Sequence, residues 1–212
     1  MRTRIIAILI LSPFILSSCK KETEEDLTGV PLVTTETILT GYEIIWGMDF
    51  IPNGDLIFGE KRGKLYRNDN ETVTEITGFP EVLSAGQGGL LDIRVHPDYA
   101  DNGWVYACYS ASNPAGGALL KLVRFKIAKD QVQDIENIFT TNGSNTWLGH
   151  YGSRIVFDDS KYLYLSVGEG GTGSYGGPNT VNDNAQDGMS SWGKIHRLRD
   201  DGSIPTDNPV IP

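Results

Sequence analysis

The sequence contains only two cysteines and three histidines among its 212 residues. These residues form no His/Cys cluster with the spacing of a metal site, and the sequence has no EF-hand calcium loop. Lys and Arg number 18 against 27 Asp and Glu, which gives a formal net charge of −9. This balance excludes the basic surface typical of nucleic-acid-binding proteins and favours solubility.

Extended helical periodicity is also absent, because no stretch repeats apolar residues at helical spacing over a dozen positions. The Gly- and Asn-rich segment 168–188 lacks the Gly-Lys-Ser/Thr of a phosphate-binding loop, and no helical pattern follows it. The sequence therefore excludes a P-loop nucleotide site in this segment.

Short apolar runs rich in Val, Ile, Tyr and Phe recur from about Gly41 onward, and turn residues separate most of them. Glycine accounts for 25 of the 212 residues, against an average near 7%. Such runs, bounded by Gly, Asn, Asp and Pro, predict a nearly all-β domain over residues 41–212.

A loose repeat runs through this domain. Segments 46–60, 88–110 and 151–169 each begin near a glycine and continue as an apolar strand, a polar turn and a second apolar strand. The leading glycines Gly47, Gly89 and Gly152 are 42 and 63 residues apart. Intervals near 40–50 residues predict β-propeller blades, and a long insertion would account for the larger second interval. A β-sandwich is the alternative, because three weak repeats can also arise in that fold.

The N-terminal segment 1–18 has two arginines followed by an apolar run too short to span a membrane, which predicts a secretory signal peptide. The last residues before Cys19, Leu-Ser-Ser, resemble a bacterial lipobox. This resemblance implies cleavage before Cys19, a lipid on its sulfur and a cell-envelope location facing the periplasm or the exterior. Plain cleavage nearby is the alternative. Residues 19–40 are expected to form a flexible tether, and Cys108, inside an apolar run, a buried thiol.

A predicted hairpin suggests a site. If residues 158–161 form a symmetric turn, His150 and Glu169 lie opposite each other on its two strands. Opposed residues have Cβ atoms about 4.5–5.5 Å apart. The carboxylate can then accept the proton on one imidazole nitrogen, which leaves the other nitrogen as a base. A one-residue bulge would shift this pairing, and a histidine here can also be a simple loop hydrogen-bonder.

The repeat adds Gln87 to this site. Gln87 lies two residues before Gly89, just as His150 lies two residues before Gly152. Equivalent positions in neighbouring blades would share one polar opening on the propeller axis. Of the other histidines, His96 is expected in a turn after a strand and His196 on a solvated strand face.

Four motifs then resemble a known family. Segments 46–66, 86–110, 149–169 and 185–209 are similar, in this order, to the glucose/sorbosone dehydrogenase family, whose members oxidise aldose sugars with pyrroloquinoline quinone (PQQ). The resemblance implies a six-bladed propeller with PQQ on its axis and a calcium ion that orients the cofactor. It implies that His150 is the general base, that Gln87 contacts the cofactor and that Glu169 replaces the usual aspartate beside the histidine.

Length departs from the family, because residues 41–212 suffice for only three to four blades. The later Arg-Asn-x-x-Gly motif is missing, so the resemblance places the calcium ligands beyond the C-terminal end of this chain. We therefore expect a fragment, with its electron acceptor unidentified. The alternative function is a non-catalytic propeller module that binds a glycan or a protein.

Overall fold

The computed structural model describes residues 33–171 and 181–209. The chain divides into two compact units, Met1–Ile38 and Leu39–Pro212. Residues 33–38 of the first unit have no regular secondary structure. The predicted signal peptide and Cys19 lie outside the described residues. Within the described ranges, no helix has the length and apolar character that a bilayer crossing needs.

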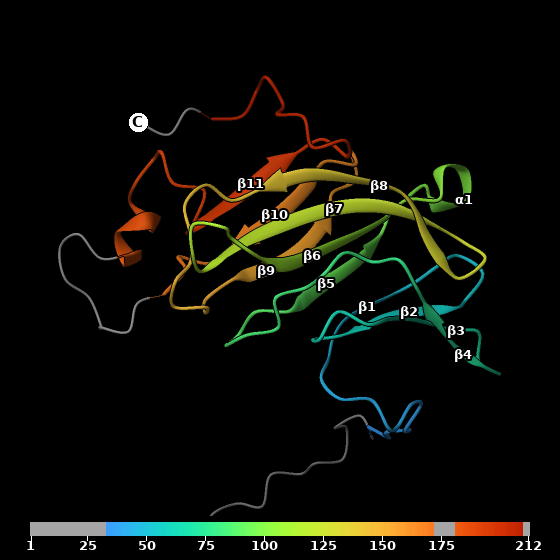
Figure 1. The fold of residues 1–212 in the computed structure, drawn as a ribbon. Coiled ribbons are helices and arrows are strands. Elements are labelled where there is room, and N and C mark those ends of the chain that lie inside the picture. The colour runs from blue at the N-terminus through green and yellow to red at the C-terminus, as the bar shows by residue number, and fades with distance from the viewer. Residues whose placement is uncertain (1–32, 172–180, 210–212) are drawn as a thin grey trace, which may run out of the picture. The chain divides into compact units, whose positions relative to one another are not determined.

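The second unit is built from three antiparallel sheets in which strands follow one another in chain order (Figure 1). The first sheet contains β1 (Ile45–Phe50), β2 (Leu56–Glu60), β3 (Leu65–Asn68) and β4 (Val73–Ile76). The second contains β5 (Leu90–Val95), β6 (Val105–Ser112), β7 (Ala118–Ala128) and β8 (Gln131–Thr140). The third contains β9 (Gly152–Phe157), β10 (Leu163–Val167) and β11 (Lys194–Leu198). The described helices are α1 (Tyr99–Asn102) and the 3₁₀ turn η1 (Val181–Ala185).

The second sheet is the middle layer, and its strands β5 and β6 are buried on both faces. Along β6, Val105 and Ala107 pack in a cluster with residues of the first sheet. Tyr106 and Cys108, on the other face, pack in a cluster with residues of the third sheet. Burial on both sides explains why this strand is a continuous apolar run rather than an alternating one. Cys108 is a free, buried thiol, as expected, and burial raises its pKa.

The first strands of the three sheets contact one another in sequence, β1 with β5 and β5 with β9. Each of them carries one bulge near its start. The register shifts lie between Ile45 and Gly47 in β1, between Leu90 and Asp92 in β5, and between Gly152 and Ile155 in β9. The stacked sheets match the predicted blades, and the shared bulge shows that the loose sequence repeat corresponds to a structural repeat.

Equivalent aspartates join consecutive sheets. A side-chain oxygen of Asp49 on β1 accepts the Val95 N–H of β5 at 2.9 Å. A side-chain oxygen of Asp92 on β5 accepts the Ile155 N–H of β9 at 2.7 Å, and Asp92 also pairs with Arg154 at 2.8 Å. These hydrogen bonds fix the position of β1 along β5 and of β5 along β9.

The expectation for His196 is wrong. Its ring is half-buried and lies 4.5 Å from the ring of Phe139 on β8, centroid to centroid. His196 pairs with Leu165, which belongs to the core, so both side chains point toward the second sheet. Alternation along a short strand did not identify which face was covered.

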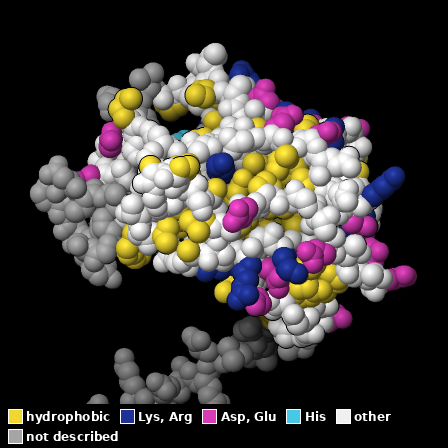
Figure 2. Space-filling view, viewed as in Figure 1, with side chains coloured by type: hydrophobic (Ala, Val, Ile, Leu, Met, Phe, Trp, Pro, Cys, Tyr) yellow, Lys and Arg dark blue, Asp and Glu magenta, His cyan; other side chains and the backbone are white. Residues whose placement is uncertain are grey.

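Hydrophobic side chains remain exposed on the two outer sheets. Trp46, Met48 and Phe50 alternate along β1 and are 39%, 53% and 60% exposed. Val156 on β9 and Ile195 on β11 are 50% and 75% exposed. Figure 2 shows hydrophobic side chains gathered in patches among charged ones on one face of the molecule.

Candidate functional site

The loops that lead into β5 and β9 meet at one end of their sheets. The Gln87 N–H donates to the Leu148 carbonyl at 2.8 Å. In return, the Gln87 side-chain oxygen accepts the His150 N–H at 2.8 Å. Two hydrogen bonds thus join residues 61 and 63 positions apart, and they bring the exposed residues Gln87 and His150 side by side. We call the surface around these two residues the opening.

The backbone geometry of these loops explains their sequence. Gly86 has a φ of +56°, and a Cβ at this position would lie 2.3 Å from the Leu148 carbonyl oxygen. On the other loop, buried Asn145 accepts the Leu148 N–H at 2.8 Å and donates to the Gly149 carbonyl at 2.6 Å. His150 itself has a φ of +51°. These hydrogen bonds hold His150 in a left-handed conformation that an isolated chain rarely adopts.

The predicted symmetric turn is wrong by one residue. The Asp158 N–H donates to the Tyr162 carbonyl at 3.0 Å, so the turn contains one more residue than a symmetric turn over 158–161. Lys161 takes up this residue with a φ of +66°. Strand pairing near the turn is accordingly shifted by one position, with Phe157 opposite Leu163.

The bulge in β9 cancels this shift. Ile155 pairs with Leu165, but Gly152 pairs with Val167, so β9 contains one extra residue between these pairs. Beyond the bulge, the register returns to the one expected from a symmetric turn. His150 and Glu169 therefore lie opposite each other, although the register close to the turn was predicted incorrectly.

His150 and Glu169 form a hydrogen bond between Nδ1 and Oε1. The His150 side chain is 46% exposed and that of Glu169 is 29% exposed. Burial alone would raise the pKa of Glu169, but the hydrogen bond from His150 and backbone N–H groups outweigh it, so the pKa lies below its ordinary value. Because Nδ1 is engaged by the carboxylate, Nε2 is the nitrogen left to face a ligand.

Gly168 allows the two strands to come this close. A Cβ at Gly168 would lie 2.0 Å from the His150 carbonyl oxygen. The Gly168 N–H donates to the Tyr151 carbonyl at 2.9 Å, and the Glu169 carbonyl accepts the Asn184 side-chain amide at 3.1 Å. Glycine before Glu169 is thus required by packing around the histidine.

Sequence reasoning missed two side chains beside this opening. The Trp147 ring stands edge-on to the His150 ring, with centroids 4.6 Å apart, and Trp147 is 40% exposed. Lys61, from the turn after β2, donates to the Gly86 carbonyl at 2.7 Å. The tryptophan lies three residues before the histidine and could have been noticed. No local signal identifies Lys61, which contacts the loop before Gln87 from the neighbouring sheet.

The opening therefore combines an imidazole nitrogen held by a carboxylate, a side-chain amide and a nearby cation. An imidazole held by a carboxylate can remove a proton from a hydroxyl, while the amide and the cation contact polar groups of a ligand. No group of three or more His, Cys, Asp and Glu residues suited to a metal ion occurs within 33–171 and 181–209.

Comparisons with known proteins find related chains. The sequence profile of the family described as Glucose / Sorbosone dehydrogenase matches residues 42–212. The chain is 30% identical to the aldose sugar dehydrogenase YliI of Escherichia coli, over 84% of the chain and 47% of that protein. It is 25% identical to quinoprotein glucose dehydrogenase B of Acinetobacter calcoaceticus, over 79% of the chain and 38% of that protein.

Among solved structures, the PQQ-bound form of aldose sugar dehydrogenase from Streptomyces coelicolor matches with a TM-score of 0.67 and 31% identity. The match covers 82% of the chain and 50% of that structure. The predicted fold, an all-β partial propeller, is thereby confirmed, with three blades in the described residues. The chain spans about half the length of the relatives that it matches.

Proposed function

Since the chain belongs to the glucose/sorbosone dehydrogenase family, we propose that the whole protein oxidises aldose sugars to lactones with PQQ and that His150 is its general base. The observation that carries the proposal is the His150–Glu169 pair, held beside Gln87 by the His150 N–H. The names of the matched relatives, an aldose sugar dehydrogenase and a quinoprotein glucose dehydrogenase, support the substrate class.

The residues present fit part of such a site. PQQ, when bound, supplies a quinone that accepts the hydride from C1 of the sugar. His150 is exposed at the opening, and the side-chain oxygen of Gln87 is engaged by the His150 N–H, which leaves the Gln87 amide nitrogen to donate to the cofactor. Lys61, which donates to the Gly86 carbonyl next to Gln87, adds a positive charge that suits an anionic cofactor.

In the proposed reaction, His150 Nε2 accepts the proton of the C1 hydroxyl, and the sugar carbon gives up its hydride as the C1–O bond becomes the lactone carbonyl. The Glu169 carboxylate accepts the Nδ1–H and stabilises the positive charge that the ring gains. Glu169 is one methylene longer than the aspartate of the family, and the β9 bulge places it within hydrogen-bond reach. The implied calcium ion and its ligands belong to the proposal for the whole protein, and the proton transfer to His150 does not require them.

A His150→Gln variant tests the proposal. In the full-length protein, reconstituted with PQQ and calcium and assayed with aldoses and a dye acceptor, we expect the rate to fall by about 10²–10⁴, the usual contribution of a general base. His196→Gln is the matched control, because His196 lies on β11, points toward the second sheet and donates its Nε2–H to the Ser191 carbonyl at 2.8 Å.

An unchanged rate in His150→Gln would reject His150 as the base. The full-length wild type should also change the quinone absorbance of added PQQ. An unchanged PQQ spectrum, together with retained binding of a sugar, would instead support the alternative function, a non-catalytic glycan-binding module.

We also propose that the protein is anchored in the cell envelope by a lipid on Cys19. The support is the sequence alone: an apolar leader followed by Leu-Ser-Ser-Cys and a charged tether. A Cys19→Ala variant should leave the membrane fraction and appear in the soluble envelope fraction, as measured by fractionation and detergent partitioning. Equal membrane retention of both forms would contradict the anchor.

A further inference from the structure

A second polar pocket lies at the other end of β9 from His150. Its volume is about 320 Å³, within the range of small-molecule sites. The walls come from the loop after β5, the turn between β9 and β10, and the turn after β11. Since β9 has six residues of about 3.3 Å each, roughly 20 Å separate this pocket from the proposed catalytic histidine.

His96 forms the floor of the pocket, and its side chain is only 3% exposed. Its Nδ1 accepts the Asp98 N–H at 2.9 Å and contacts the Asn102 side-chain nitrogen at 2.8 Å. The Asn102 side-chain oxygen accepts the Trp104 N–H, which identifies the nitrogen of the amide as the group facing His96. Nδ1 is therefore an acceptor, and the proton of the neutral ring is on Nε2.

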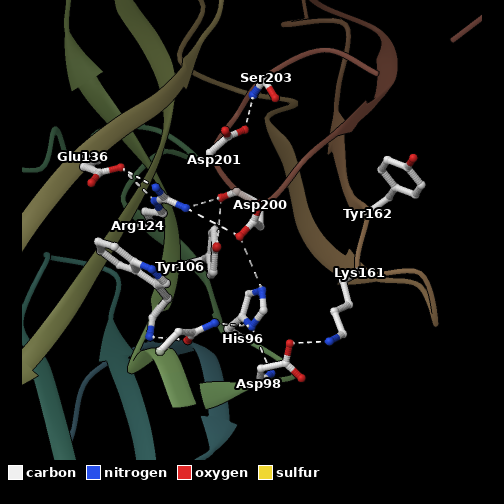
Figure 3. A network of polar contacts seen from close by, with 12 residues as sticks. His96, Asp98, Tyr106, Arg124, Glu136, Lys161, Tyr162, Asp200, Asp201 and Ser203 are labelled. Atoms are coloured by element: carbon white, nitrogen blue, oxygen red, sulfur yellow. Dashed lines mark hydrogen bonds and ion pairs between the residues drawn. The ribbon is translucent and has the colours of Figure 1, made fainter. Parts of the chain in front are cut away.

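This Nε2–H is a buried donor without a hydrogen-bond partner among the described residues. The nearest carboxylate oxygen, Asp200 Oδ2, is 3.9 Å away, beyond hydrogen-bond distance (Figure 3). Buried polar groups are almost always paired. The donor itself has almost no contact with solvent, and the pocket that His96 and Asp200 line is much larger than one water molecule needs. A ligand with an acceptor oxygen would satisfy it.

Asp200 is fixed in position from the second sheet. Its carbonyl accepts the Tyr106 hydroxyl at 2.9 Å and Arg124 at 3.1 Å. Arg124 in turn binds Glu136 at 2.8 Å. As Figure 3 shows, these contacts hold Asp200 and the turn after β11 against the second sheet, whose strand β5 leads into His96. The Asp200 and His96 walls of the pocket are therefore held in place.

The charges that line the pocket are balanced. Asp98 pairs with Lys161, and the wall adds one further acid, Asp200, and one further cation, Arg199. A free anion would meet two carboxylates. A metal ion would meet a protonated Nε2, two cations and no ligand cluster suited to it in the described part of the chain. The pocket instead offers hydrogen-bond donors and acceptors without net charge.

From this geometry we propose that the pocket binds a neutral polyhydroxylated ligand, such as a monosaccharide, at a site separate from the catalytic opening. One ligand hydroxyl accepts the His96 Nε2–H, and the same or an adjacent hydroxyl donates to the Asp200 carboxylate. The gap between these two groups is bridged by the ligand rather than closed by the protein. Sugar hydroxyls combine both roles, which suits a mixed set of His, Asp, Asn and Lys side chains.

The test uses imidazole NMR of the ¹⁵N-labelled full chain, with D-glucose as the probe. We expect the His96 Nε2–H tautomer in the free protein and a saturable shift of the Nε2 signal on adding glucose. Asp200→Asn should weaken this response by at least about tenfold, because it removes a charged acceptor. Asp201→Asn is the matched control, since the neighbouring carboxylate accepts the Ser203 N–H and does not line the pocket.

Two further variants separate this site from others. Ser160→Trp, in the exposed β9–β10 turn, should fill the pocket and abolish the response without removing a charge. His150→Gln should leave the response intact, so failure of the proposed catalytic function would not affect this result. The proposal is overturned if His96 shows no saturable shift up to ~100 mM glucose. It is equally overturned if sodium phosphate or calcium chloride saturates the signal in place of glucose.

Discussion

Glu169 determines what His150 can do at the scale of single residues. The carboxylate binds Nδ1, while the Gln87 side chain binds the backbone of the same histidine. His150 is thus held by both its ring and its main chain, and its remaining nitrogen faces the opening. A loop histidine with neither contact would sample several rotamers, which would slow proton transfer.

The lowered pKa of Glu169 predicts a pH-dependent contribution to stability. A carboxylate whose folded-state pKa lies below its unfolded value stabilises the fold at neutral pH, and this contribution is lost as pH falls through the folded-state pKa. Glu169→Gln should therefore unfold at a lower temperature than the wild type at about pH 7, and the difference should shrink as the pH falls through the lowered folded-state pKa of Glu169. Thermal unfolding followed by circular dichroism measures both values.

Glu71→Gln is the control, because Glu71 lies in an exposed turn. It should show a smaller difference across the same range. A deficit of Glu169→Gln that is equally large at both ends of the pH range would contradict the hydrogen-bonded carboxylate as its source.

At the scale of elements, paired irregularities position the site. The longer β9–β10 turn and the β9 bulge each shift the register by one residue, in opposite directions. Similar bulges in β1 and β5 occur near the same end of their strands. Bulges re-aim side chains at the rims of sheets, and here the bulge brings Glu169 opposite His150.

Gly168→Ala tests how tightly β9 and β10 approach. A Cβ would meet the His150 carbonyl at 2.0 Å, so we expect a loss of about 2–4 kcal/mol in unfolding free energy and a displaced histidine loop. Gly116→Ala is the matched control: it has a φ of +98° and no atom within 4 Å of the added Cβ. Its cost should be only that of the left-handed backbone, about 1 kcal/mol. Similar losses in urea unfolding of the two variants would contradict a steric role for Gly168.

The described part of the second unit is a stack of three sheets, in which core clusters cover both faces of the middle sheet. The exposed side chains of β1, and Val156 and Ile195 on the third sheet, lie on the two outer sheets of this stack. The relatives are about twice as long as the matched segment. Exposed apolar patches of this kind favour association.

We therefore expect the chain to self-associate as its concentration rises, as measured by size-exclusion chromatography with light scattering. A Phe50→Ser, Ile195→Thr double variant should shift the distribution toward the monomer with little change in thermal stability, because both side chains are exposed. Ile135→Thr is the control: it removes an exposed isoleucine from β8 instead of the outer sheets. A wild-type chain that stays monomeric at every concentration would contradict the prediction.

The sequence alone determined the strands and the repeat, and it singled out Gln87, His150 and Glu169 as candidates for one site. Val- and Ile-rich runs between turn residues specify strands locally, and the interval between repeated motifs sets where each blade begins. The same information failed for His196, since alternation along five residues does not show which face another sheet will cover.

Only the tertiary structure decided the contacts within the site. The His150–Glu169 pairing depends on a turn residue and a bulge that compensate each other, and neither has a sequence signature. Lys61 and Gln87 reach the opening from neighbouring sheets, and Asp200 closes the second pocket opposite His96 from a turn some hundred residues away. These contacts depend on how whole sheets stack, because burial and hydrogen bonding between sheets fix positions that local chain preferences leave free.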